Sequence, residues 1–140
     1  MTDFWDHLAM RPKVLVVDDH IEFAQLLGFN LEKVGCEVLM AHDGAHALRV
    51  ARAQLPDVIL LDIMLPDLDG LSVCEILNSQ PSTRDIPVII VSALNSSWTE
   101  TRKSNARYTR FLTKPVDLKS LRELVISTAL AHHAAAHASN

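Results

Sequence analysis

Four short apolar segments constrain the fold of this 140-residue chain more than any other feature. They are Val14–Val17, Val38–Met40, Val58–Leu61 and Val88–Val91. β-Branched residues recur in these segments, and polar residues do not alternate with the apolar ones. Runs of this kind are typical of parallel strands that are covered on both faces. The sequence therefore predicts a buried parallel sheet.

Apolar residues at helical spacing separate the predicted strands. The first repeat includes Phe23 and Leu26, and Gly35 then offers a C-terminal stop. Ser97 and Glu100 have the spacing of a capping box, with Ser97 as the N-cap of a further helix. The other expected helices cover residues 21–33, 45–53, 71–78 and 118–130.

A fifth strand is expected over residues 110–113, and Asp117 is the expected N-cap of the closing helix. Five strands that alternate with five helices predict a doubly wound α/β domain with a five-stranded parallel sheet and helices on both faces. We expect an N-terminal extension over residues 1–11, the domain over 12–131 and an Ala/His-rich tail over 132–140. Such folds bind ligands outside the carboxyl ends of the strands, where the strand order reverses.

Composition narrows the classes of function. The formal net charge of −4 disfavours direct binding of nucleic acid, which needs a basic excess or a dense basic patch. The N-terminal residues lack the pattern of a signal peptide, and no apolar run approaches the ~20 residues that span a bilayer. Cys36 and Cys74 form no CxxC pair, so we expect reduced core residues. These features predict a cytoplasmic protein without membrane insertion.

Polar residues follow four of the five expected strands at the edge where ligands would bind. Asp18 and Asp19 follow the first strand, Asp62 ends the third, Ser92 ends the fourth and Lys114 follows the fifth. Three carboxylates at one edge repel one another and call for a cation. Mg²⁺ prefers oxygen ligands and binds a few carboxylates together with a phosphate. With that ion and Lys114 neutralising a phosphoryl group, Asp62 could attack it as a nucleophile.

Four sequence blocks around these residues match one family. The blocks are Val14–Asp19, Asp62–Gly70, Val91–Ala93 and Phe111–Pro115, and together they resemble the receiver domain of two-component response regulators. The resemblance extends over roughly residues 13–131. It implies that the domain accepts a phosphoryl group from a histidine kinase or a histidine phosphotransfer protein. The phosphorylated domain would then act on a downstream protein target.

The resemblance also implies a role for each matched residue at the acidic edge. Asp62 would be the phosphoacceptor. Asp19, Asp62 and the backbone carbonyl of Met64 would bind Mg²⁺ directly, with Mn²⁺ as an alternative ion. Asp18 would act on the ion through water.

The remaining matched residues would bind the phosphoryl group and change conformation in response to it. By the resemblance, the Ser92 hydroxyl and the Ala93 backbone amide would contact phosphoryl oxygens, and Lys114 would pair with one of them. Ser92 and Phe111 would form the switch: the hydroxyl moves toward the phosphoryl group and the ring turns inward. The bond before Pro115 is often cis in relatives.

Departures from the family pattern lie on the surface whose conformation would change on phosphorylation. The segment Arg107–Arg110 replaces a run in which relatives usually carry glycine and acids, and Trp98 adds an aromatic side chain. Arginine and aromatic residues are enriched at interaction hot spots. Trp98, Arg107, Tyr108 and Arg110 therefore form a candidate partner surface, for a target protein or for a phosphorylation-dependent homodimer. A solvated helix end without a special partner is the alternative that the sequence leaves open.

Two other functions remain as alternatives to the receiver. An Asp-nucleophile phosphatase of the haloacid dehalogenase type needs a second acid at the position of Met64. A pseudo-receiver binds partners without phosphorylation, but it usually lacks the acceptor or the acidic pair. We therefore predict a signalling phosphoacceptor that is not a turnover enzyme. Because nine residues after Ala131 cannot form an output domain, we expect a stand-alone receiver.

Two weaker features complete the sequence-based expectations. Met64 and Leu94 are apolar at positions that influence hydrolysis of the phosphoryl group in relatives, so we expect a long-lived phosphorylated form. His132, His133 and His137 include a metal-like i, i+4 pair. A solvated, alanine-rich helix is favoured there, because the sequence places no acid or cysteine beside these histidines.

Overall fold

A five-stranded parallel sheet forms the central layer of the computed structural model, which describes residues 11–137 apart from the side chains of residues 99, 101 and 137. The strand order is β2-β1-β3-β4-β5, and every neighbouring pair is parallel. The strands are β1 (Lys13–Val17), β2 (Glu37–Ala41), β3 (Val58–Leu61), β4 (Val88–Ser92) and β5 (Arg110–Thr113). The predicted doubly wound α/β fold is confirmed.

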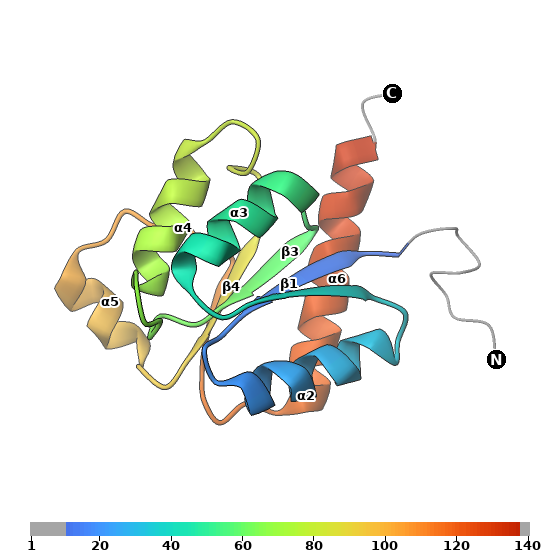
Figure 1. Ribbon diagram of the computed structural model, residues 1–140, viewed down its shortest axis with the longest axis horizontal. Coiled ribbons are helices and arrows are strands. Elements are labelled where there is room, and N and C mark those ends of the chain that lie inside the picture. Colours follow the sequence, from blue (N-terminus) through green and yellow to red (C-terminus); the bar gives the residue numbers. More distant parts are fainter. Residues whose placement is uncertain (1–10, 138–140) are drawn as a thin grey trace.

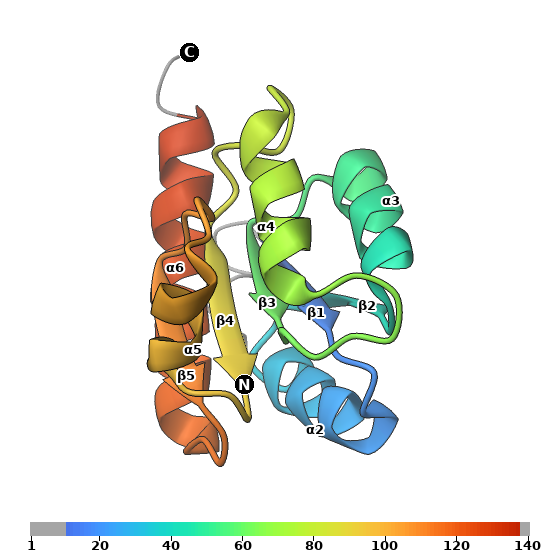
Figure 2. The ribbon, with the colours of Figure 1, turned by 90° about the vertical axis from the view of Figure 1, so that its left-hand side faces the viewer.

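Helices cover both faces of this sheet (Figures 1 and 2). One face carries α2 (Ile21–Glu32) and α6 (Leu118–His137). The other carries α3 (Gly44–Gln54), α4 (Gly70–Ser79) and the short α5 (Ser96–Arg102). All five expected helices are therefore present in the described part of the chain.

Alternate residues of each central strand enter separate hydrophobic cores. In β1, Leu15 and Val17 pack beneath α3 and α4, whereas Val14 and Val16 pack against α2 and α6. All four of these side chains are at most 1% exposed. Because both faces of the strand need apolar side chains, the segments lack the polar alternation of a half-exposed sheet.

Helix ends follow the sequence signals with one correction. Gly35 has a φ of 97°, as expected for a residue that stops a helix, and Asp117 accepts a hydrogen bond from the Ser120 N–H at 3.0 Å. The prediction that Ser97 caps a helix is wrong. Asn95 is the N-cap, and its side chain accepts a hydrogen bond from the Ser97 N–H at 3.1 Å. Asparagine is at least as good a cap as serine, so the helix begins two residues earlier than predicted.

The apolar repeat of α2 predicted the helix correctly, but it did not fix which residues are buried. Leu27 is 4% exposed, whereas the adjacent Leu26 is 47% exposed. Successive residues of a helix point about 100° apart, and the core-facing stripe of α2 includes Leu27 but not Leu26. Phe23 is half-buried near the start of the helix.

Two further expectations concern cysteines and membranes. Cys36 and Cys74 are buried as reduced thiols, and burial raises the pKa of Cys74 to about 12. At neutral pH this thiol is therefore protonated and a poor nucleophile. Within residues 11–137, none of the helices combines the length and apolar character that crossing a bilayer requires.

The histidines near the end of α6 have an acidic neighbour, contrary to expectation. Nδ1 of His132 lies 3.3 Å from Asp57 Oδ1, and Nδ1 of His133 lies 3.4 Å from the same atom. Asp57 precedes β3, 75 residues before His132, so the sequence did not show this proximity. Its other oxygen accepts the Lys13 backbone N–H at 2.9 Å. The side chain of His137 lies outside the described residues.

The hydrogen bonds of Asp57 make its contribution to stability depend on pH. Burial alone would raise the pKa of Asp57, but the hydrogen bonds from His132 and Lys13 and the two imidazoles together lower it below 3.8. A carboxyl whose pKa is depressed by folding stabilises the native state above its unfolded pKa. This contribution is lost as the pH falls through the lower, native pKa.

We expect Asp57→Ala to lower the free energy of unfolding at pH 5 by about 1–2 kcal/mol, because the Lys13 N–H loses its acceptor. The difference from the unsubstituted protein should shrink toward pH 3. Urea titrations at both pH values measure it, with exposed Asp85→Ala, at the same end of the sheet, as the control. An Asp57→Ala difference that stays constant with pH would contradict the role of the carboxylate charge.

Candidate functional site

The carboxyl ends of β1 and β3 place two aspartates side by side. These strands pair up to Val17 and Leu61, the last residues before Asp18 and Asp62. The Asp62 N–H donates to the Val17 carbonyl at 3.0 Å, which fixes the backbone one residue beyond the strand. Asp18 and Asp62 are only 3% and 6% exposed. The chain goes from β1 to its neighbour β2, and from β2 it crosses over β1 to β3 on the other side. The carboxyl ends of β1 and β3 therefore form the topological switch point of the sheet.

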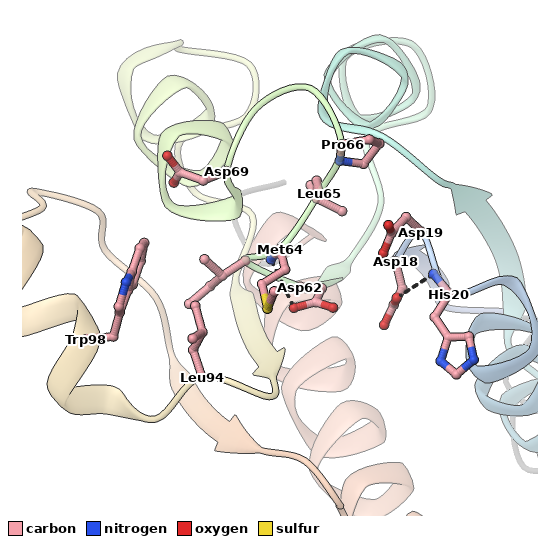
Figure 3. A pocket seen from close by; sticks show the side chains of 11 residues that line it. Asp18, Asp19, His20, Asp62, Met64, Leu65, Pro66, Asp69, Leu94 and Trp98 are labelled. Atoms are coloured by element: carbon pink, nitrogen blue, oxygen red, sulfur yellow. Dashed lines mark hydrogen bonds between the residues drawn. The ribbon is translucent and has the colours of Figure 1, made fainter.

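Asp19 completes an acidic cluster with these two residues. Asp18, Asp19 and Asp62 each offer one carboxylate oxygen, and the three oxygens lie within 4.8 Å of one another. The side chain of Asp19 is exposed to solvent, in contrast to the other two. All three side chains line one pocket (Figure 3). The structure therefore brings together the three carboxylates that the sequence predicted to meet.

Lys114 partly neutralises this cluster. Its Nζ lies 2.8 Å from Asp18 Oδ2 and 3.1 Å from Asp62 Oδ2. Burial alone would lower the pKa of Lys114, but the hydrogen bonds to Asp18 and Asp62 and their negative charges outweigh this and raise it. The ammonium therefore stays charged at neutral pH. The peptide bond from Lys114 to Pro115 is cis, as the family pattern suggested.

The donor set fits a hard divalent cation. Three carboxylates and one ammonium carry a formal charge of −2 in total, which a divalent cation would balance. Oxygen ligands gathered within 4.8 Å suit Mg²⁺, which takes few carboxylates and retains water. No cysteine or histidine joins this oxygen cluster among the described residues, so the chemistry of the site does not favour zinc.

The pocket above the cluster has one acidic and one apolar wall. Its volume is about 520 Å³. Asp18 and Asp19 stand on one side of Asp62, and Leu94 and Trp98 stand on the other (Figure 3). Met64 lies beside Asp62 and is 56% exposed. A small phosphorylated group can therefore reach Asp62 from solvent between these walls.

The loop that follows Asp62 folds tightly upon it. The Gly70 N–H donates to the Ile63 carbonyl at 2.8 Å, and the Met64 N–H donates to Asp62 Oδ1 at 3.2 Å. A Cβ atom at Gly70 would lie 2.1 Å from the Asp62 carbonyl oxygen. Only glycine allows this approach, which explains the glycine at the end of the Asp62–Gly70 block.

Two acids of this loop anchor it to the neighbouring helices. Asp67 accepts hydrogen bonds from the N–H groups of Gly44 and Ala45 at 2.7 and 2.9 Å, which lowers the pKa of Asp67 to about 2. Asp69 caps α4 by accepting the Ser72 N–H at 2.9 Å. The sequence analysis missed the Asp67 contact, because its partners lie more than 20 residues away and carry no motif.

Arg102 makes a second contact that the sequence analysis missed. Its guanidinium donates to Asp69 Oδ2 at 2.9 Å and to Glu75 Oε1 at 3.3 Å, and it lies 5.9 Å from the centre of the Trp98 ring. This arginine ties the C-terminal end of α5 to the first turns of α4. Trp98 is held over the pocket by the same residue.

The residues expected to contact phosphoryl oxygens lie close to this edge. Ser92 ends β4, is fully buried, and accepts the Leu94 N–H on its hydroxyl at 3.4 Å. Its carbonyl also accepts the Lys114 N–H at 2.8 Å. Ala93 is exposed and follows it directly. Neither residue is among those that line the pocket around Asp62.

Phe111 and three of the four expected partner residues, Arg107, Tyr108 and Arg110, lie in or just before β5, whereas Trp98 lines the pocket. Phe111 is half-buried, and its ring lies 6.0 Å from that of Tyr108 in an edge contact. Arg107 and Arg110 are exposed. Arg107 is also tied to α4, because its N–H donates to Asn78 Oδ1 at 2.7 Å. Two of the four proposed partner residues, Trp98 and Tyr108, pack partly against the core.

The fold and the site together define a class of α/β domains that carry an acidic cluster and a lysine at the carboxyl edge of a parallel sheet. The response regulator receiver domain family matches residues 14–126. The chain therefore belongs to this family, whose members are signalling phosphoacceptors of two-component systems and bind Mg²⁺ at an acidic cluster.

Individual relatives agree with this assignment. The chain is 42% identical over 108 residues to the response regulator PleD of Caulobacter vibrioides, covering 77% of this chain and 24% of the relative. It is 38% identical over 106 residues to the alkaline phosphatase synthesis transcriptional regulatory protein PhoP of Bacillus subtilis, covering 76% and 43%. The chain thus spans less than half the length of these curated relatives.

Solved structures share the fold. The receiver domain of a Francisella response regulator has 37% sequence identity and a TM-score of 0.75, with 86% of this chain and 98% of that chain covered. The receiver domain of a sensor histidine kinase from Pseudomonas aeruginosa, solved with a magnesium ion in its active-site cleft, has 27% identity and a TM-score of 0.75. That comparison covers 85% of this chain and 98% of the other.

We expect Gly70→Ala to weaken Mg²⁺ binding at least about tenfold, or roughly 1.4 kcal/mol, because the added methyl group must displace the Asp62 carbonyl. Isothermal titration with Mg²⁺ measures the affinity. Gly28→Ala is the matched control, since a Cβ there meets the flexible end of the Met40 side chain, away from the acidic cluster. Equal loss of affinity in both variants would contradict a local effect on Asp62.

Proposed function

We propose that Asp62 accepts a phosphoryl group from a histidine kinase or a histidine phosphotransfer protein in a Mg²⁺-dependent reaction. The observation that carries this proposal is the contact of Lys114 with two buried carboxylates, Asp18 and Asp62, which line an open pocket. A surface carboxylate without such neighbours would not attract a divalent cation. It would also lack an ammonium group that can pair with phosphoryl oxygens. A cytoplasmic location is part of the proposal, because nucleotide-dependent kinases act there.

In the transfer step a carboxylate oxygen of Asp62 attacks the phosphorus atom of a phosphohistidine. An O–P bond forms, the N–P bond breaks, and the electron pair returns to the imidazole, which takes up a proton from solvent. Lys114 then pairs with a phosphoryl oxygen, together with the Ser92 hydroxyl and the Ala93 amide. Charge stabilisation of this kind accounts for most catalysis of phosphoryl transfer. The domain thus promotes its own phosphorylation and dephosphorylation without turning over a separate substrate.

The acidic cluster would hold the metal ion in this reaction. Asp19, Asp62 and the Met64 carbonyl are the proposed direct ligands, and Asp18 acts through water; Mn²⁺ is an alternative ion. When bound, the ion supplies positive charge that offsets the charge of the phosphoryl oxygens. Two observations support the assignment: the spacing of the three carboxylates, and the magnesium ion in the cleft of the Pseudomonas aeruginosa receiver domain.

The signal would leave the domain through the surface formed by α5, β5 and α6. We propose Ser92 and Phe111 as the switch, because Ser92 is buried at the end of β4 and Phe111 lies on the adjacent strand. The exposed guanidinium groups of Arg107 and Arg110 make this surface locally basic. It would bind a downstream protein target or, after phosphorylation, a second copy of the domain. The proposal includes no direct contact with nucleic acid.

Phosphorylation by a small phosphodonor tests whether Asp62 is the acceptor. Incubation with Mg²⁺ and acetyl phosphate should add one phosphoryl group that is stable in acid and labile in base, and Asp62→Asn should abolish the adduct. Intact-mass spectrometry measures the adduct, and Asp85→Asn, an exposed acid at the opposite edge of the sheet, is the matched control. No adduct on the unsubstituted protein would favour a pseudo-receiver. Rapid turnover of the phosphodonor would favour a phosphatase.

The apolar side chains of Met64 and Leu94 should prolong the lifetime of the phosphorylated form. Met64 and Leu94 present no hydrogen-bonding group to an attacking water, so Met64→Asn with Leu94→Asn should accelerate dephosphorylation by about tenfold, or roughly 1.4 kcal/mol of activation free energy. Loss of the adduct with time measures the rate. Leu55→Asn is the control, because Leu55 is 51% exposed, close to the 56% of Met64, is remote from the pocket and has a left-handed conformation that asparagine adopts readily. An unchanged rate in the double variant would contradict the prediction.

A further inference from the structure

Lys114 has a third neighbour besides its two carboxylates. Its Nζ lies 4.4 Å from the centre of the Phe23 ring, a distance at which the ring face attracts a cation. Phe23 lies in the first turn of α2, four residues after Asp19. The lysine and the phenylalanine are 91 positions apart in the sequence, and only the fold brings them together.

We propose that Phe23 is a positioning residue, whose ring face keeps the Lys114 ammonium at the site of phosphoryl transfer. This inference rests on the proposed phosphorylation of Asp62. It concerns the placement of the cation and adds no chemical step.

The need for such a contact follows from what happens to the carboxylates. In the structure, Lys114 is held by Asp18 and Asp62, and its side chain is 20% exposed. When Asp62 becomes an acyl phosphate, that carboxylate loses its charge, and the ammonium must move to a phosphoryl oxygen. A lysine side chain is long and flexible, so losing one partner would increase the freedom of its ammonium. Asp18 remains as one partner, and the Phe23 ring, which is also unchanged by the reaction, restricts this freedom from a second side.

A ring face serves this purpose better than a third carboxylate. Its attraction for the cation comes from the quadrupole of the ring and acts across the whole ring face, so the ammonium can shift by a short distance above that face without losing it. The ring carries no net charge and does not repel the incoming phosphoryl group. An acid at position 23 would hold Lys114 more strongly, but it would also add negative charge beside the acidic cluster.

The ring itself is held in place by packing. Phe23 packs against the core formed by α2, α6 and one face of the sheet. The His20 ring lies nearly parallel to it, with the ring centres 6.5 Å apart and an interplanar angle of 13°. The neighbouring Ala24 is fully buried, which fixes this turn of the helix against β1. Phe23 is therefore part of a rigid element and can constrain a flexible side chain.

The direct test compares ring electrostatics with bulk at position 23. Phe23→Leu keeps an apolar side chain of similar size and removes the ring, whereas Phe23→Trp supplies a ring with a stronger attraction for cations. We expect Phe23→Leu to slow phosphorylation by acetyl phosphate about threefold and Phe23→Trp to restore the rate. The matched control is Phe29→Leu: Phe29 is on the same helix, is 61% exposed and also has a lysine over its ring, but it is remote from the pocket.

A spectroscopic readout tests the contact without relying on the reaction. Protons above an aromatic ring shift upfield, so the methylene protons next to Lys114 Nζ should resonate upfield of those of exposed lysines. This shift should disappear in Phe23→Leu. Spectra of Lys114→Arg assign the signal, and thermal unfolding confirms that each variant is folded.

The outcomes separate this inference from the proposed function. If Phe23→Leu is phosphorylated at the unsubstituted rate, or if Phe23→Trp is as slow as Phe23→Leu, the positioning role is overturned while phosphorylation of Asp62 stands. If the unsubstituted protein accepts no phosphoryl group, the proposed function fails and this role fails with it. An ordinary methylene shift for Lys114 in the unsubstituted protein overturns the contact even where a variant does not fold.

Discussion

The pairing of two buried carboxylates with one lysine is the interaction on which the site depends. The parallel pairing of β1 and β3 ends with a hydrogen bond from the Asp62 N–H to the Val17 carbonyl, which brings Asp62 beside Asp18. Adjacent anions with little exposure are unfavourable unless a cation accompanies them. Lys114 supplies part of that charge, and it reaches the pair only because β5 ends beside β4 at the same edge. The remaining negative charge of the cluster would attract a divalent cation, the kind of ion that receiver domains bind at an acidic cluster.

The loop after Asp62 connects the acidic cluster to three neighbouring helices. Asp67 holds the loop against the first turn of α3, and Asp69 caps α4 while pairing with Arg102 of α5. A change of charge at Asp62 would therefore occur at the start of a loop that is bonded to three helices. Since packed elements move between discrete arrangements, such bonds can transmit a local change to the α5 side of the domain. Trp98 takes part in both regions, because it lines the pocket and stacks near Arg102.

Membership of the receiver family accounts for the chemistry but leaves the output of this chain as a proposal. The chain spans less than half the length of the PleD and PhoP relatives, so the activities of those whole proteins do not transfer to it. Phe23 contacts the Lys114 ammonium from α2, and the exposed Arg107 and Arg110 give the β5 side of this chain a basic character.

The sequence by itself determined the order of elements, the buried sheet and the strand-end residues Asp18, Asp62 and Lys114, because these depend on local periodicity and on chain topology. It misplaced the cap of α5, because Asn95 and Ser97 are both good caps and stand two residues apart. It could not tell Leu26 from Leu27, since their burial depends on which face of α2 packs on the sheet. Only the tertiary structure brought together Lys114 with Phe23, Asp67 with α3, and Asp57 with His132. Each of these contacts joins residues far apart in the chain, and short-range patterns carry no information about such distances.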